Sequence, residues 1–152
     1  MFMSNIKLNK IFKTACIASD HAGYKLKELI KEFLIDKNVS IFDMGPFNNQ
    51  SVDYPDYAKK LARRIRMKKS DVGILVCGSG TGMAISANKI KTIRAAVCYN
   101  LKSTRLSRQH NNANIIALGS RLTNKKLSLK LVEVFLKTKF EGGRHLRRVK
   151  KI

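Results

Sequence analysis

Apolar residues follow two alternating spacings along the chain. Short, mainly apolar runs at 15–18, 39–42, 72–76, 94–98 and 115–118 are typical of buried strands. Between these runs, apolar residues recur every three or four positions, which predicts helices from 22 to 34, after Asp53, and over 83–90, 103–110 and 123–136. Five predicted strands therefore alternate with five predicted helices.

This alternation predicts the fold class. Strand, helix and strand in succession form right-handed crossovers, so the strands should lie parallel in one sheet that helices cover on both faces. A chain of 152 residues suits one domain of this α/β class. We expect a single domain over 1–152, with an N-terminal extension at 1–12 and a basic C-terminal arm at 139–152.

Three polar clusters directly follow predicted strands. They are Asp20-His21, the loop 77–82 and the segment 119–121. In open parallel sheets, ligands bind at the carboxyl ends of the strands, near the point where the strand order reverses. The sequence thus predicts a ligand site at this edge before any family is considered.

The formal net charge of +21 is the unusual bulk property. Such a charge suits nucleic acid or an anionic membrane surface. However, the basic residues are spread over nearly every predicted helix, and no aromatic residues are interleaved with them as a stacking platform requires. We favour a lysine-rich surface around a small anionic ligand, and expect neither nucleic acid nor a membrane as partner.

The cysteine pattern indicates a reducing compartment. Cys16, Cys77 and Cys98 are odd in number and widely spaced, in a chain without an apolar leader or an apolar run long enough to span a membrane. We therefore expect a cytoplasmic protein with free thiols.

The glycine loop is the first candidate for chemistry. Gly78, Gly80 and Gly82 would let backbone amides approach an anion at the start of the next helix. The loop lacks the spacing of dinucleotide and P-loop motifs, and such a turn is often only a tight connection. Cys77 lies between a buried strand and a helix amino terminus, where a thiolate is stabilised. From spacing alone, packing and chemistry are equal alternatives for this residue.

Histidines and arginines supply further candidates with structural alternatives. His110 ends a polar helix, and Asp20 could simply cap the helix that follows it. Arg144 and Arg148 would share a helical face that suits a phosphate, or form a solvated basic tail. We expect no metal site, because the three histidines are far apart in the sequence and lack companion ligands at metal-binding spacing.

Together, the motifs resemble the ribose-5-phosphate isomerase B family from about residue 13 to residue 149. The matching segments, in order, are Ser19–Gly23, Asp53–Pro55, Cys77–Gly82, Ala87–Lys89, Ser107–Asn111, Gly119–Arg121 and Glu141–His145. The resemblance implies a Rossmann-like three-layer fold and a homodimer or homotetramer with active sites at the subunit interface. It also implies interconversion of ribose 5-phosphate and ribulose 5-phosphate without a cofactor.

The resemblance also implies roles for individual residues. Cys77 is similar to the base that moves a proton between C1 and C2, and His110 to the acid that opens the furanose ring. Asp20 and His21 resemble residues that hold the sugar. The remaining implied ligand contacts are the loop that cradles the enediolate (Gly78, Ser79, Gly80, Thr81, Gly82), then Asn111 and Arg121, and for the phosphate Arg144 and Arg148.

Alternatives within and outside this class remain open. One branch of the family lacks the cysteine and has a glutamate base at the position that Met83 occupies here. A methionine cannot take a proton. The resemblance therefore implies the cysteine-dependent, metal-independent reaction. A hexose 6-phosphate, of allose or galactose, is the nearest rival substrate. The related galactose-6-phosphate isomerases are heteromers, whereas a full set of candidate groups in one chain favours a homomer. A basic nucleic-acid-binding module is the alternative from another class.

Overall fold

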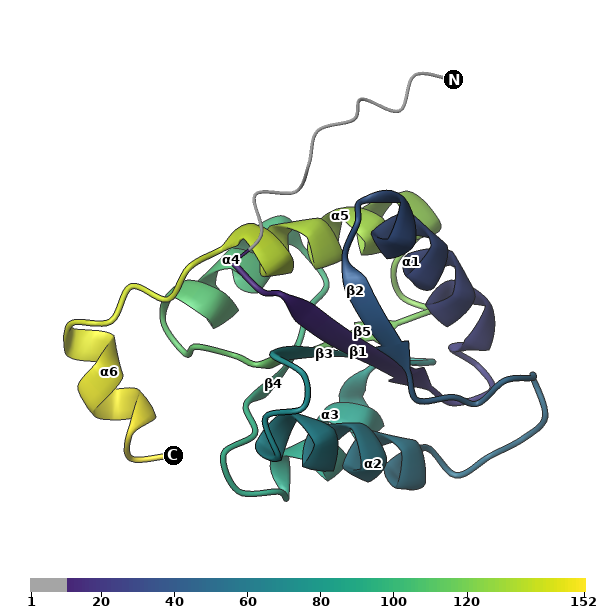
Figure 1. Cartoon of the computed structure of the whole chain (residues 1–152), viewed down its shortest axis with the longest axis horizontal. Helices are drawn as coiled ribbons and strands as arrows, with labels where there is room; N and C mark the ends of the chain where they lie inside the picture. The colour runs from purple at the N-terminus through teal and green to yellow at the C-terminus, as the bar shows by residue number, and fades with distance from the viewer. Residues whose placement is uncertain (1–10) are drawn as a thin grey trace.

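The computed structural model describes residues 11–152 and contains one parallel sheet (Figure 1). Its five strands have the order β2-β1-β3-β5-β4, and every neighbouring pair is parallel. The strands are β1 (Thr14–Ser19), β2 (Ser40–Asp43), β3 (Val72–Cys77), β4 (Ala95–Val97) and β5 (Ile115–Gly119). The predicted five-stranded α/β fold is confirmed, while most of the predicted N-terminal extension lies outside the described residues.

Helices cover both faces of this sheet, as the alternating pattern predicts. Figure 1 shows α1, α4 and α5 on one side, α2 and α3 on the other, and α6 apart from the sheet at the end of the C-terminal arm. Their bounds are α1 (Tyr24–Asp36), α2 (Tyr54–Arg66), α3 (Thr81–Asn88), α4 (Leu101–Gln109), α5 (Lys125–Lys137) and α6 (Arg144–Val149). The fold therefore has three layers with an added arm.

Two apolar cores follow from the alternation of side chains along the central strands. On β3, Ile74 and Val76 join the core under α1 and α5, whereas Leu75 and Cys77 face α2 and α3. Every residue of β3 is buried, because the strand lies at the centre of the sheet with helices on both sides. Cys77 is thus the last residue of a strand that is buried along its whole length.

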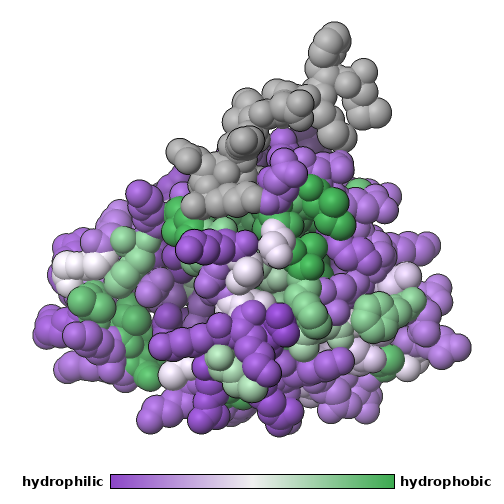
Figure 2. Space-filling view, viewed as in Figure 1, coloured by the Kyte–Doolittle hydropathy of each residue, from purple (hydrophilic) through white to green (hydrophobic). Residues whose placement is uncertain are grey.

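One lysine that the sequence places on the surface is buried instead. Lys27 has no exposed side-chain area, and its ammonium group donates to Glu28 at 2.6 Å and to Asp43 at 2.8 Å. Its neighbours explain this position, since a buried ammonium is tolerated when carboxylates pair with it. Elsewhere, hydrophilic side chains cover most of the face in Figure 2, with apolar residues in small separate groups.

The strand register brings the polar tips of β1, β3 and β5 together. Ser19 pairs with Val76, and Cys77 pairs with Gly119. Gly23 permits the tight join between β1 and α1, because a Cβ at this position would lie 2.2 Å from the Val76 carbonyl oxygen. Among the described helices, none is both long and apolar enough to cross a membrane.

Candidate active site

A cavity of about 390 Å³ opens at the carboxyl ends of the three central strands. It joins the polar clusters that the sequence places after β1, β3 and β5. Its lining consists of Asp20, Tyr54, Cys77, Gly78, Ser79, Gly82, Arg121 and Leu122. Residues that follow β1 and β5 therefore line one pocket together with the glycine loop that follows β3. This agrees with the rule that ligands bind at the carboxyl ends of parallel strands.

Cys77 is one of the residues that line this cavity. The residue is 5% exposed, and its Sγ accepts a hydrogen bond of 3.1 Å from the backbone N–H of Gly80. Gly80 has a φ of +80° and directly precedes α3, so a glycine is favoured there. The loop thereby points a backbone donor and a helix amino terminus at the sulfur, an arrangement that stabilises negative charge.

The other two cysteines occupy apolar surroundings that hold them as thiols. Burial raises the pKa of the Cys16 thiol to about 12, although Ser70 and Arg64 oppose the change. Burial also raises the pKa of Cys98. Both belong to the apolar cores, which agrees with a packing role for each.

Two loop glycines make room for side chains that enclose the cavity. A Cβ on Gly78 would lie 3.2 Å from the guanidinium of Arg121, and a Cβ on Gly82 would lie 2.7 Å from the ring of Tyr54. Tyr54 is a cavity residue that the sequence analysis does not propose, because its pattern predicts only the start of a helix after Asp53. The available signal is the matched segment Asp53–Pro55, which contains Tyr54.

Asp20 and His21 are fixed by backbone donors. The Asp20 carboxylate is 7% exposed and accepts the N–H of Gly23 at 2.9 Å, which is the capping role that we considered for it. His21 is exposed, and its Nδ1 accepts the N–H of Val52 at 3.3 Å, which leaves Nε2 to carry the hydrogen of the neutral ring. Asp20 lines the cavity, whereas His21 and Thr81 do not.

His110 lies near the amino ends of the strands, whereas Cys77 lies at their carboxyl ends. Helix α4 begins after the carboxyl end of β4 and returns to the amino end of β5, so its last residues lie at the amino edge. A hydrogen bond of 2.9 Å from Arg94, which precedes β4, to the carbonyl of Asn112 confirms this placement. One chain therefore does not bring His110 to its own Cys77.

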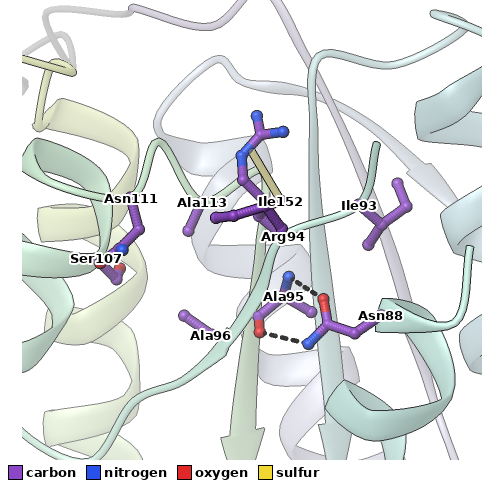
Figure 3. A pocket seen from close by; sticks show the side chains of 9 residues that line it. All are labelled: Asn88, Ile93, Arg94, Ala95, Ala96, Ser107, Asn111, Ala113 and Ile152. Carbon is purple, nitrogen blue, oxygen red and sulfur yellow. Dashed lines mark hydrogen bonds between the residues drawn. The ribbon is translucent and has the colours of Figure 1, made fainter. Parts of the chain in front are cut away.

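Asn111 lines a different cavity, of about 300 Å³, beside the edge strand β4 (Figure 3). In this cavity, the side chain of Asn88 accepts the N–H of Ala95 at 2.7 Å and donates to its carbonyl at 2.9 Å. Figure 3 shows Asn111 and Ser107 on the opposite side of the cavity from Asn88. Asn88, in the matched segment Ala87–Lys89, thus pairs with both backbone polar groups of Ala95 in the edge strand β4.

His110 instead contacts the C-terminal arm. Its ring stacks on His145, with centroids 4.2 Å apart and an interplanar angle of 10°. Partial removal from water lowers the pKa of His145, and the nearby His110 and Arg144 lower it further. These two histidines are thus in contact in the fold although they are far apart in the sequence.

Arg144 and Arg148 are exposed on α6, close enough to His145 to affect its pKa. The candidate residues therefore form two groups. The cysteine half-site consists of Asp20, Cys77, the loop 78–82 and Arg121, and the histidine half-site consists of His110, Arg144 and Arg148. The structure of one chain separates them.

Comparisons with known proteins agree on one family. The sequence profile described as Ribose/Galactose Isomerase matches residues 15–152. Ribose-5-phosphate isomerase B of Escherichia coli is 41% identical over 140 residues, which cover 92% of this chain and 94% of that protein.

Solved structures show the same relationship. Ribose-5-phosphate isomerase B of Clostridium thermocellum has a TM-score of 0.90 and 47% identity, covering 91% of this chain and 93% of the other. The Mycoplasma genitalium enzyme, solved with bound ribulose 5-phosphate, has a TM-score of 0.87 and 43% identity, covering 91% and 92%.

Proposed function

Because the chain belongs to the Ribose/Galactose Isomerase family of sugar-phosphate isomerases, we propose that it interconverts ribose 5-phosphate and ribulose 5-phosphate, with Cys77 as the base and without a metal ion. The observation that supports this proposal best is Cys77, which lines the cavity beside the glycine loop and whose sulfur accepts a hydrogen bond from the Gly80 N–H. The relatives named as ribose-5-phosphate isomerase B support the choice of a pentose.

The reaction moves one proton between adjacent carbons. In the forward direction, the Cys77 thiolate removes the proton on C2 of the open-chain aldose, and the electron pair forms the C1–C2 double bond of an enediolate. The resulting thiol returns the proton to C1, while the hydroxyl proton on O2 moves to O1. Backbone amides of the loop 78–82 would face the developing charge on oxygen, and removing one such donor typically costs about 3–4 kcal/mol.

Ring opening requires a second acid–base group near the sugar. His110 suits this task because its side chain is 38% exposed, and because an imidazole is the side chain that enzymes use most often to transfer protons. His110 and Cys77 lie at opposite ends of the strands. A second copy of the chain would therefore have to supply the histidine half-site. We therefore include a homodimer, or a larger homomer containing such a pair, in the proposal.

The arginines provide charge for the phosphate. Arg121 borders the cysteine half-site, while Arg144 and Arg148 belong to the histidine half-site. In the paired arrangement, the phosphate would lie among guanidinium groups of both chains. Binding energy from the phosphate would then position C1 and C2 against the sulfur.

A coupled isomerase assay tests this function. Ribose 5-phosphate should be turned over with and without a chelator, and faster than allose 6-phosphate or galactose 6-phosphate. Cys77→Ser should lower kcat by about 10²- to 10⁴-fold, the usual contribution of a positioned base, whereas Cys98→Ser should retain turnover. Near-normal activity in Cys77→Ser would remove the sulfur from the mechanism, and loss of activity with chelator would contradict the metal-free reaction.

A further inference from the structure

Three side chains near the C-terminal arm form a cluster that suits a transition-metal ion. His110 follows α4, Glu141 lies in the link between α5 and α6, and His145 is in the first turn of α6. One donor atom from each lies within 4.8 Å of the other two. The Glu141 carboxylate is 3.9 Å from Nε2 of His110 and 3.6 Å from Nε2 of His145.

We propose that His110, Glu141 and His145 bind one divalent transition-metal ion, with Zn²⁺ as the best match, and that this ion inhibits the enzyme. The inhibitory part rests on the proposed function. Two imidazole nitrogens and one carboxylate oxygen are a set that zinc accepts, with a fourth position left for water. Ligands at bond lengths of about 2.0–2.2 Å stand about 3.4 Å apart in a tetrahedral site. The donor atoms are thus near the required spacing, and the two imidazole rings must turn out of their parallel stack so that both nitrogen lone pairs point at the ion.

The backbone already holds the three residues in place. The N–H of Glu141 donates to the carbonyl of Gln109 at 3.1 Å, which fastens the link to the end of α4. The N–H of His145 donates to Gly142 at 3.0 Å, and that of His110 donates to Leu106 at 2.9 Å. Because these hydrogen bonds fix the main chain around all three residues, binding requires reorientation of side chains rather than ordering of the main chain.

The surrounding charge limits the affinity. Arg144 and Arg148 act on His145 and oppose a further positive charge, while Glu141 favours it. We therefore expect weaker binding than at structural zinc sites, whose ligands are folded around the ion. The bound ion would occupy the Nε2 lone pair of His110, so this histidine could no longer exchange a proton with the sugar ring. A chelator should consequently raise the activity of zinc-exposed enzyme.

Zinc chloride titrated calorimetrically into the full chain, after removal of metals with a chelator, measures the site directly. We expect one ion per chain in the wild type. His145→Asn and Glu141→Gln should each weaken binding by about 10- to 100-fold or more, since each removes a ligand. His21→Asn serves as the matched control, because this exposed histidine is not part of the cluster, and it should bind zinc as the wild type does. Cobalt chloride gives a second readout through its visible absorption when bound with fewer than six ligands.

Turnover of ribose 5-phosphate tests the inhibition. Zinc should inhibit the wild type reversibly, and His145→Asn should keep its basal activity and resist zinc. Undetectable zinc binding in the wild type, or unchanged binding in both ligand variants, would overturn the site. Loss of binding in Cys77→Ser would also overturn it by placing the ion on the thiol. If zinc binds as described but the chelated protein does not isomerise the sugar, the proposed function fails and the metal site stands.

Discussion

The three cysteines show how one side-chain type takes on different properties through its surroundings. Cys77 receives a backbone hydrogen bond at the edge of a cavity, whereas Cys16 and Cys98 lie in the apolar cores. Burial disfavours the charged thiolate, and this raises the pKa of both core residues. Only Cys77 of the three lines a described cavity.

Cys16 should make the protein sensitive to alkali. Its pKa is about 12 in the fold and 9.0 in its ordinary state, so between these values the unfolded chain has lost the proton that the folded chain keeps. The free energy of unfolding should therefore fall as the pH rises, with a slope approaching about 1.4 kcal/mol per pH unit from this group. Urea unfolding at several alkaline pH values should show a shallower decline in Cys16→Ala. Parallel declines in the two proteins would contradict the assignment.

Gly82 should act on the cavity through Tyr54. A Cβ at Gly82 would meet the Tyr54 ring at 2.7 Å, and a ring at the surface can move aside without disturbing the core. Gly82→Ala should therefore lower kcat/KM with little change in unfolding free energy. Tyr54→Ala removes the clash. The effects of the two substitutions on kcat/KM should therefore not add in the double variant, with a coupling free energy of about 0.5–3 kcal/mol. Strictly additive effects would show that the alanine acts elsewhere.

At the scale of elements, a buried charge cluster connects α1 to β2. Asp43 accepts hydrogen bonds from Lys27, Lys31 and the N–H of Gly45. Burial alone would raise the pKa of Asp43, but these donors outweigh burial and lower it. The connection fixes the start of the loop that leads from β2 to α2.

Asp43→Asn should destabilise the fold because it removes the main partner of a fully buried ammonium group. Breaking a buried pair typically costs about 3–5 kcal/mol, and we expect the lower end because Glu28 still contacts Lys27. The more exposed Glu28→Gln is the control, with a loss below about 1 kcal/mol.

The acid dependence of Asp43 provides an independent check. Since the folded pKa is lowered, the stabilisation is complete above the ordinary carboxyl pKa of 3.8 and is lost as the pH falls through the folded value. The difference in unfolding free energy between wild type and Asp43→Asn should therefore shrink in acid. Urea titrations that show a constant difference would contradict this account.

At the scale of the whole molecule, the two half-sites lie at opposite ends of the parallel strands. The cysteine half-site follows the carboxyl ends of β1, β3 and β5, and the histidine half-site lies beyond the end of α4. A single chain cannot apply both to one sugar. Activity should therefore require pairs of chains.

Mixing two inactive variants tests this requirement. Cys77→Ser keeps an intact histidine half-site, and His110→Asn keeps an intact cysteine half-site. Random pairing after co-refolding should restore about a quarter of wild-type sites, because half of the dimers are mixed and each holds one intact site of two. Cys77→Ser mixed with Asp20→Asn should recover nothing, since both changes damage the same half-site. Equal inactivity in both mixtures would indicate an active site within one chain.

Local patterns predicted the sheet and the cysteine half-site, but not contacts made by the arm. Apolar runs gave the strands, and parallel strand ends bring Asp20, Cys77 and Arg121 together without further information. The stacking of His110 on His145 depends on the path of residues 138–143, where Gly142 and Gly143 both have positive φ values. Spacing along the chain does not encode that path, just as it does not reveal the carboxylates that bury Lys27.

The separation of the half-sites across the sheet also bears on how such a gene could evolve after duplication. Each daughter copy would need only one edge of its sheet intact, provided that it associates with the other copy. One could lose its sulfur and the other its imidazole, and the pair would still keep one working centre. An obligate partnership between diverged paralogues is thus a single mutation away on each side.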